Sequence, residues 1–229
     1  MNKDMPSDLR TRTLALVNEK NAENKPAEQL GALIGAWLGS LDDEDLAGVS
    51  PDSLAAILQD GFAQVAQRTG QGCQIAQMRY TDGRCGMSTA LLILNEDMPY
   101  LVDSFVMALR RQRVVATGVM NAVLPVRRDA NGAVAAVGEA GAPLESYVLC
   151  LLGEDLPQEE LAALVERLQM VARDAAVVHR DAVAMGDRMS AVAADAAAQG
   201  TPAGQEVAAF LEWARNEGFE PFGYAYYFV

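Results

Sequence analysis

The 229-residue sequence predicts an α+β fold whose elements follow the βαββαβ order of ferredoxin-like domains. The first observation behind this prediction is a change in hydrophobic spacing. Apolar residues recur every three or four positions before residue 70, and afterwards they alternate or form continuous runs. The second observation is the order of elements from residue 87 onward: strand, helix, strand, hairpin strand and helix, with a further helix and strand to follow. This order favours an antiparallel or mixed sheet with helices on one face.

Two amphipathic helices are predicted before the first strand. Residues 1–26 are polar and predict a mobile arm or a short helix, and a helix follows from Pro26 to Gly39-Ser40. The residues 42–46 resemble a helical turn. Ser50-Pro51 then begins a second helix, because proline suits a first helical turn.

The central part of the chain predicts strands separated by one helix. That helix is expected to begin near Asp97, as a plausible N-cap, with Pro99 in its first turn, and to end at Arg110–Arg113. Gly118 or Pro125 is expected to mark a bulge or an end in the second of the long strands. The predicted strands are 75–80, 89–94, 114–126, 133–137 and 146–152.

The C-terminal part predicts two helices and one strand. A long helix starts after Pro157 and ends at Gly200-Thr201-Pro202, and a last helix ends at Gly218. Phe222, Tyr224, Tyr226 and Phe228 share one parity, as in a strand. This strand either completes the sheet of this domain or begins a further domain, in which case the chain is a truncated piece of a longer protein.

Composition excludes several classes of function. Lys and Arg number 18 against 31 Asp and Glu, and a net charge of −13 opposes binding to nucleic acid or to an anionic membrane. No apolar run approaches the roughly 18 residues of a membrane span, and we expect no signal peptide. Three cysteines without a C-x-x-C spacing fit a reducing compartment, so we expect a cytoplasmic protein.

Few residues are available for catalysis. The only lysines lie before residue 26, which excludes a P-loop or Schiff-base lysine elsewhere, and the single histidine, His179, excludes a two-histidine metal site. Glycine pairs at 70–72 and 83–86 complete no phosphate-binding motif. Cys85 and Ser88 fit structural roles better than nucleophilic ones, and the acidic residues 153–160 are those expected at a helix start.

One group of residues has a plausible binding chemistry. The segment Asn95–Pro99 joins a buried strand to a helix, and Asp103-Ser104 follows one to two turns later. The N–H groups of a helix start bind a carboxylate, and neighbouring Asp or Asn side chains bind an ammonium group, so this place suits an amino acid. The alternative, an acid-rich helix start with no ligand, is favoured when spacing alone is considered.

At these residues the sequence resembles the N-terminal ACT-like region of the large bacterial NAD-dependent glutamate dehydrogenases. The resemblance rests on NEDMPYLVDSFVMALRRQ at 95–112, on VLPVRRDANGAV at 123–134, on Glu145-Ser146, and on two aromatic stretches within 210–224. It covers about residues 50–229. The chain departs from the family at three places, because Asn121-Ala122 replaces His-Pro, Phe222 replaces Leu and Ala225 replaces Arg, so no role of that His or Arg is carried over.

The resemblance implies a non-catalytic regulatory and architectural segment of a longer enzyme. That parent oxidises L-glutamate to 2-oxoglutarate and ammonia and reduces NAD, and this chain itself is expected to bind no cofactor or metal and to hold no catalytic residue. We expect it to contact the rest of the parent and other copies of itself, as a homo-oligomer. The alternatives are a free-standing amino-acid-binding or adaptor protein of the same fold and, less compatible with the missing lysines, an independent enzyme.

The resemblance also implies an effector site and a domain division. ACT-like domains commonly bind amino acids at the strand-to-helix connection, which places the candidate pocket at Asn95, Asp97, Met98, Pro99, Asp103 and Ser104, with Asn121 on the adjacent strand. The expected division is an arm with helices at 1–72, an ACT-like domain at 73–175 and a helical extension with the next strand at 176–229.

Overall fold

The structure is a computed structural model that describes residues 5–21, 25–42, 49–68, 70, 72–82, 86–216, 219 and 223. It divides into two compact units, Met1–Arg173 and Asp174–Val229. The elements of the described residues are α1 (Met5–Asn21), α2 (Lys25–Gly39), α3 (Pro51–Val65), β1 (Gln74–Asp82), β2 (Gly86–Glu96), α4 (Leu101–Arg111), β3 (Ala116–Arg128), β4 (Val134–Val137), β5 (Leu144–Leu152), α5 (Gln158–Ala198) and α6 (Pro202–Asn216).

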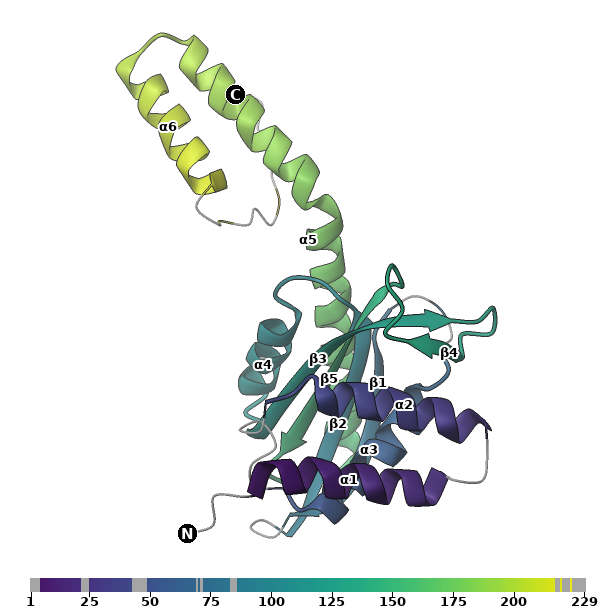
Figure 1. The fold of residues 1–229 in the computed structure, drawn as a ribbon. Coiled ribbons are helices and arrows are strands. Elements are labelled where there is room, and N and C mark those ends of the chain that lie inside the picture. Colours follow the sequence, from purple (N-terminus) through teal and green to yellow (C-terminus); the bar gives the residue numbers. More distant parts are fainter. Residues whose placement is uncertain are drawn as a thin grey trace. The chain divides into compact units, whose positions relative to one another are not determined.

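The first unit is built on a five-stranded antiparallel sheet with the strand order β1-β2-β5-β3-β4 (Figure 1). Strands β2 and β3 flank β5 and are joined by α4, which is the split βαβ arrangement of ferredoxin-like folds. The edge beside β2 is filled by β1, which precedes it in the chain, whereas the predicted order placed a later strand after the last helix. Most of that later strand, at 219–229, lies outside the described residues.

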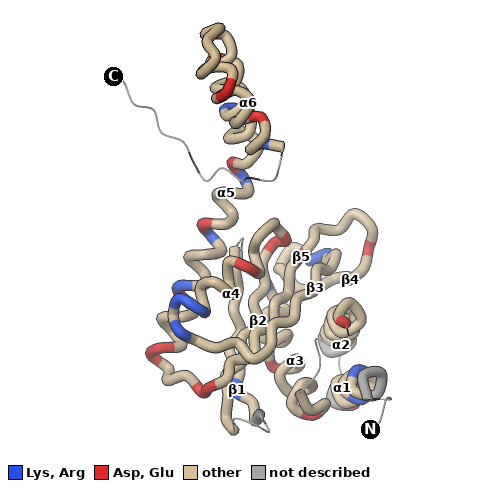
Figure 2. Tube along the Cα trace, turned by 90° about the vertical axis from the view of Figure 1, so that its left-hand side faces the viewer, with Lys and Arg blue, Asp and Glu red and all other residues tan. Residues whose placement is uncertain are grey.

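Helices cover both faces of the sheet, so the prediction of helices on one face was wrong. Helices α1, α2 and α3 lie on one side of the sheet and α4 on the other (Figure 2). The first group buries apolar side chains against one face, and α4 with the first part of α5 buries them against the other. The reason lies in the strands, because β2 and β5 carry apolar residues on both sides and are buried almost throughout. Strands of this kind need an apolar cover on each face.

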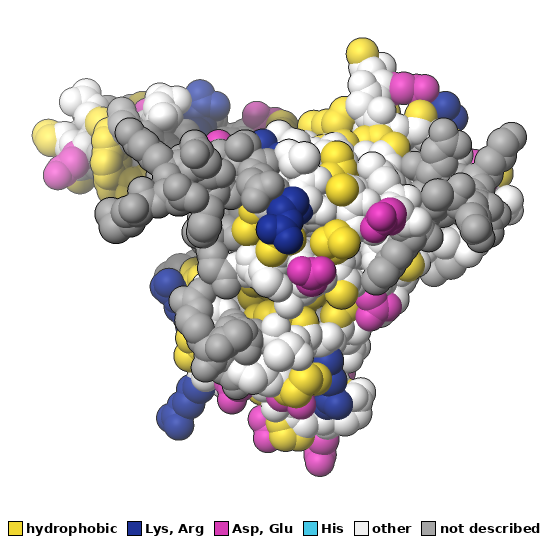
Figure 3. Space-filling model, turned by 60° about the horizontal axis from the view of Figure 1, so that its bottom comes forward, with side chains coloured by type: hydrophobic (Ala, Val, Ile, Leu, Met, Phe, Trp, Pro, Cys, Tyr) yellow, Lys and Arg dark blue, Asp and Glu magenta, His cyan; other side chains and the backbone are white. Residues whose placement is uncertain are grey.

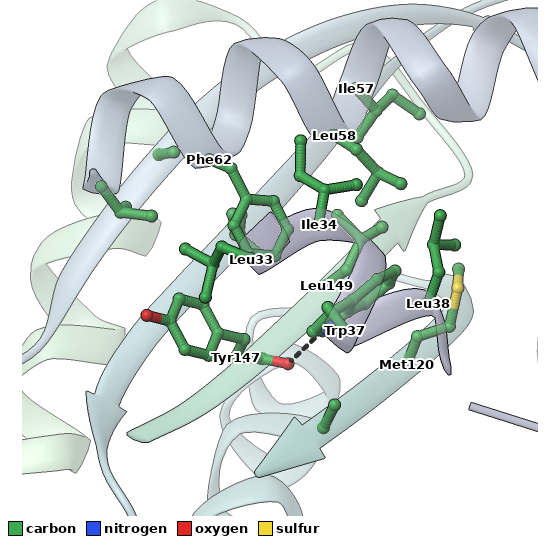
Figure 4. Close-up of a cluster of buried hydrophobic side chains, with 14 of the residues drawn as sticks. Leu33, Ile34, Trp37, Leu38, Ile57, Leu58, Phe62, Met120, Tyr147 and Leu149 are labelled. Atoms are coloured by element: carbon green, nitrogen blue, oxygen red, sulfur yellow. Dashed lines mark hydrogen bonds between the residues drawn. The ribbon is translucent and has the colours of Figure 1, made fainter. Parts of the chain in front are cut away.

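The centre of the core joins the N-terminal helices to β5 (Figure 4). The indole Nε1 of Trp37 in α2 donates a hydrogen bond of 3.0 Å to the backbone oxygen of Tyr147. The ring of Phe62 in α3 stacks on Tyr147 with centroids 5.3 Å apart, and the edge of Trp37 meets Phe62 at 5.9 Å. Such packing of large aromatic side chains makes α2 and α3 integral parts of the core.

The two best-defined helix starts differ in how closely they follow the sequence prediction. Ser50 caps α3 by accepting from the N–H of Ser53, with Pro51 in the first turn as predicted. Helix α4 instead begins at Leu101, and its N-cap residue is Tyr100 with no side-chain cap hydrogen bond. For α4, the predictions of Asp97 as N-cap and of Pro99 in the first turn were therefore wrong. The physical reason is that the N–H of Asp97 donates to the carbonyl of Leu144 and prolongs the sheet.

The remaining boundaries follow the sequence closely. For residues 1–26 the alternatives were a mobile arm and a short helix, and the structure shows a helix over residues 5–21. The predicted turn at 42–46 lies almost entirely outside the described residues. The strand β3 shifts register between Ala116 and Gly118, which confirms the bulge. Helix α5 ends at Ala198, before the positive-φ Gly200, and α6 begins at Pro202.

The second unit pairs the last part of α5 with α6. Gly204 lies so close to the carbonyl of Ala196 that a Cβ at this position would overlap it, which explains glycine at this crossing. Phe210, Trp213 and Phe219 form a cluster with ring centroids 5.9 and 5.2 Å apart, and each of the three remains substantially exposed.

The surface mixes charge and apolar side chains. On the face shown in Figure 3, acidic and basic side chains are interspersed among apolar ones. Among the helices that the structure describes, none is long and apolar enough to cross a membrane.

Candidate functional site

The predicted binding residues lie around the connection from β2 to α4. Asn95 is buried at the end of β2, and Met98 is half-buried against the core beneath α4 and α5. Asp97 and Pro99 in the connection and Asp103 in the first turn of α4 are exposed. The carboxylates of this group are thus accessible to a ligand.

Three polar residues form a row across the adjacent strands β2, β5 and β3. Asn95 lies opposite Ser146 in the register of β2 and β5, and Ser146 Oγ donates a hydrogen bond of 2.9 Å to Asn121 Oδ1. Their side chains share the face on which α4 packs, because they alternate with residues of the opposite core. We call Asn95, Asn121 and Ser146 the polar row. The structure therefore places Asn95, Ser146 and Asn121 on one face of three adjacent strands, and Ser146 is hydrogen-bonded to Asn121.

The start of α4 adds backbone donors beside the polar row. Tyr100 has φ 63°, a left-handed conformation that side chains other than Gly, Asn and Asp rarely adopt. Its carbonyl accepts the N–H of Ser104 at 3.0 Å and closes the first helical turn, whose earlier N–H groups point out of the helix end. These donors suit a carboxylate, and the carboxylates of Asp97 and Asp103 suit an ammonium group.

A second polar cluster, which sequence reasoning missed, lies on the opposite face at the same end of β5. The guanidinium of Arg128 donates two hydrogen bonds to the Glu145 carboxylate, of 2.8 and 2.9 Å. Arg68 donates to the same carboxylate at 3.2 Å, and the hydroxyl of Tyr147 donates to it at 2.6 Å. We call Arg68, Arg128, Glu145 and Tyr147 the Glu145 network. The available signal was a single acidic residue at the start of an apolar strand.

Electrostatics of the Glu145 network keep the carboxylate charged. Burial opposes ionisation of Glu145, but hydrogen bonds from Arg128 and Tyr147 and the charges of the two arginines outweigh it and hold its pKa below the ordinary value. Burial, with the adjacent charge of Glu145, raises the pKa of Tyr147 well above its ordinary value. Tyr147 therefore remains a hydrogen-bond donor at neutral pH.

The Glu145 network holds the start of β5 in place, and with it Ser146 of the polar row. Arg128 Nη1 donates to the carbonyls of Ala66 and Gly132, both at 2.8 Å, and the N–H of Arg68 donates to Gly132 at 2.9 Å. The network thus ties the end of α3 and the β3–β4 turn to the start of β5. Because Glu145 and Ser146 are adjacent and face opposite sides of the sheet, holding the first also positions the second.

The other residues considered in the sequence fit structural roles. Burial raises the pKa of the Cys73 and Cys150 thiols to about 12 in each case, which leaves them protonated and unreactive. Ser88 is fully buried, and His179 is exposed on α5. Cys85 lies outside the described residues.

The described residues were compared with the requirements of a metal site, and the connection from β2 to α4 with those of a dinucleotide loop. There, no group of three or more His, Cys, Asp or Glu side chains is placed to hold a metal ion. The connection from β2 to α4 carries Asp97, Met98, Pro99 and Tyr100 and no glycine. It does not fit a dinucleotide loop, whose glycines allow the backbone to approach a pyrophosphate.

Comparison with known protein families decides the family. The model of the glutamate dehydrogenase ACT1 domain matches residues 33–168, which is more than half of the chain. The chain belongs to this family. No curated protein matches it.

The ACT1 match contains both candidate clusters. It begins within α2, earlier than the sequence resemblance, which starts at about residue 50, and it ends within the first part of α5. It therefore includes the motifs at 95–112 and 123–134, and the latter supplies Arg128 and the turn glycine of the Glu145 network. The aromatic stretches within 210–224 lie beyond the match, and their resemblance stays a prediction.

Proposed function

We propose that this ACT1 domain is a non-catalytic regulatory and architectural segment of a large NAD-dependent glutamate dehydrogenase. The parent converts L-glutamate and NAD to 2-oxoglutarate, ammonia and NADH. The family match carries the proposal. The composition supports it, because glutamate dehydrogenases rely on active-site lysines and this chain has none after residue 25. We place the protein in the cytoplasm, because its three cysteines, an odd number without a C-x-x-C spacing, fit a reducing compartment.

The effector of this segment is an amino acid held where β2 passes into α4. The backbone donors at the start of α4 bind its carboxylate, Asp97 and Asp103 bind its ammonium group, and the polar row lies beside them. Asn121 is an exposed residue whose Oδ1 accepts a hydrogen bond from the buried Ser146, so its side chain is held in place by the neighbouring strand β5. Binding favours one arrangement of the parent's domains and shifts its activity by the difference in affinity between arrangements.

Contacts with the rest of the parent and with other copies use the free edge of the sheet. Strand β4 pairs only with Val126–Arg128 of β3, and in the described residues the outer edge of β3 before Val126 has no strand beside it. An unpaired edge is a template for pairing with another strand. A homo-oligomer joined at this edge brings polar rows of two copies toward one interface.

A thermal-shift experiment on the full 229-residue chain tests the effector. Each of the common amino acids, 2-oxoglutarate and NAD is added at millimolar concentration. A ligand at about 100 times its Kd stabilises the folded state by about 2.7 kcal/mol, so one amino acid is expected to raise Tm by several degrees. NAD is expected to leave Tm unchanged.

Three variants test whether the rise in Tm comes from binding at the proposed site. Asp97→Ala and Asn121→Ala alter exposed side chains at the proposed site and are expected to abolish the shift. Asp52→Ala removes an exposed acid from the first turn of α3 and is expected to retain it. No shift with any amino acid, or an equal shift in all three variants, contradicts the effector site. Production of NADH from L-glutamate by this chain contradicts the non-catalytic assignment.

A further inference from the structure

A groove lies at the opposite end of α4 from the polar row. It runs between the last turn of α4 and the first residues of β3 and has a volume of about 460 Å³. This volume is in the range of small-molecule sites. Its lining is mostly aliphatic, with arginines at the rim: Val106, Leu109, Arg110, Arg113, Val114, Val115, Ala116 and Val119.

The rim carries positive charge that no described acidic residue pairs with. Arg110 and Arg113 are exposed, with Arg111 beside them, and no described residue forms an ion pair with any of the three. Figure 2 shows the basic stretch at the end of α4. In a chain of net charge −13, this stretch is an attractive site for an anion.

The backbone at Arg113 points to a role for its side chain. The N–H of Arg113 donates to Arg110 and the N–H of Val114 donates to Leu109, both at 3.0 Å, which is the Schellman ending of a helix. The left-handed position of this motif is usually glycine, and here Arg113 occupies it with φ 61°. A side chain other than glycine costs about 1 kcal/mol there. Such strain is typical of sites where the side chain does something beyond folding.

We propose that this groove binds a small amphipathic anion, with its apolar chain against the valines and its carboxylate at Arg110 and Arg113. The aliphatic lining removes the apolar chain from water, and the two guanidinium groups form charge-assisted hydrogen bonds with the anionic head group. The anion site differs from the proposed amino-acid site, because Arg110 and Arg113 lie at the C-terminal end of α4 and Asp97 and Asp103 at its N-terminal end.

Binding of octanoate to the full chain, measured by isothermal titration calorimetry, tests this site. Octanoate is expected to bind, and octanamide, which has the same chain without the charge, is expected to bind about tenfold more weakly. No heat of binding at about 10 mM octanoate overturns the proposal, since mass action would saturate even a weak site at that concentration. Equal binding of octanamide also overturns it.

Arg113→Gly separates ligand binding from folding. The variant removes the guanidinium and relieves the left-handed strain, so Tm is expected to be unchanged or higher while octanoate affinity falls about fivefold or more. Arg111→Ala is the control, because Arg111 does not line the groove, and it is expected to keep the affinity. Unchanged affinity in Arg113→Gly contradicts the site. Size-exclusion chromatography tests the alternative that a second copy of the chain occupies the groove. If the wild-type chain is a dimer, Arg113→Gly is a monomer and octanoate does not bind, the groove is a dimer interface and the anion proposal is wrong.

Discussion

The Glu145 carboxylate accepts two hydrogen bonds from the Arg128 guanidinium, at 2.8 and 2.9 Å. Both side chains are largely buried, with 3% of the Glu145 side chain and 11% of the Arg128 side chain exposed. A buried charge pair of this kind is stabilising only when its remaining hydrogen-bonding groups are satisfied. Arg128 meets this condition through the carbonyls of Ala66 and Gly132, and Glu145 through Tyr147. The pair therefore fixes one geometry for three chain segments.

Removal of the carboxylate is expected to destabilise the first unit strongly. Glu145→Ala leaves Arg128 buried without its counter-charge and leaves Arg68 with only the exposed Glu96, at 3.7 Å, as an ion-pair partner among the described residues. Breaking a buried pair in this way costs about 3–5 kcal/mol. Urea unfolding, followed by circular dichroism, measures the loss. The matched control is Glu139→Ala, because Glu139 forms an equally bidentate pair with Arg127 on the surface, and the change there is expected to be small. Equal losses in the two variants would show that burial of the pair is irrelevant.

The Glu145 network also predicts a dependence of stability on pH. The folded pKa of Glu145 lies below its ordinary value of 4.5, so its stabilisation is fully present above that pH. It is lost as pH falls through the folded pKa, because the unfolded chain takes up the proton first. The difference in unfolding free energy between wild type and Glu145→Gln is expected to shrink between pH 7 and about pH 3.5. A difference that stays constant over this range contradicts the assignment.

Sequence patterns predicted the elements of this fold well because the patterns are local. Ser50-Pro51 at the start of α3 and Gly200 after α5 act through the backbone of their own neighbours. The start of α4 was misplaced because a partner distant in sequence decides it. Asp97 pairs its N–H with Leu144, which is 47 positions further along the chain, and a single sequence does not show that pairing.

The same distinction holds for the candidate sites. Asn95 and Asn121 were identified as polar residues near a strand-to-helix connection, but their position on one face with Ser146 between their strands depends on strand order. The Glu145 network was missed because Arg68, Arg128 and Glu145 come from three segments that only the folded chain brings together. The packing of helices on both faces of the sheet was not predicted for a related reason. Hydrophobic spacing shows that a helix has an apolar face, but it does not show which face of the sheet that helix packs against.

The integral role of α2 predicts unequal effects for the two tryptophans. Trp37 is fully buried and hydrogen-bonded to β5, so Trp37→Ala is expected to cost about 3–5 kcal/mol. Trp213 is 49% exposed on α6, and Trp213→Ala is expected to leave the stability of the first unit unchanged. Far-UV circular dichroism follows the unfolding in both variants, because Trp37→Ala removes the only tryptophan of the first unit and leaves Trp213 as a fluorescence probe of the second. Native-like unfolding of the first unit in Trp37→Ala would exclude α2 from the cooperative core.

Two glycines with nearly the same backbone conformation separate strain from close packing. Gly132 has φ 81° and Gly138 has φ 83°, so alanine meets the same left-handed penalty of about 1 kcal/mol at either position. Around Gly138 no atom lies within 4 Å of an added Cβ, whereas at Gly132 the Cβ would overlap the carbonyl of Arg68. That overlap forces apart the segments that the Glu145 network joins.

Gly132→Ala is therefore expected to lose about 3 kcal/mol or more of unfolding free energy, and Gly138→Ala about 1 kcal/mol. Urea titration of both variants at pH 7 measures the difference. A second comparison tests the cause: in a Glu145→Ala background the extra cost of Gly132→Ala is expected to fall, because the contacts it disrupts are already lost. Strict additivity of the two changes would mean that the turn and the buried charge pair stabilise the domain independently.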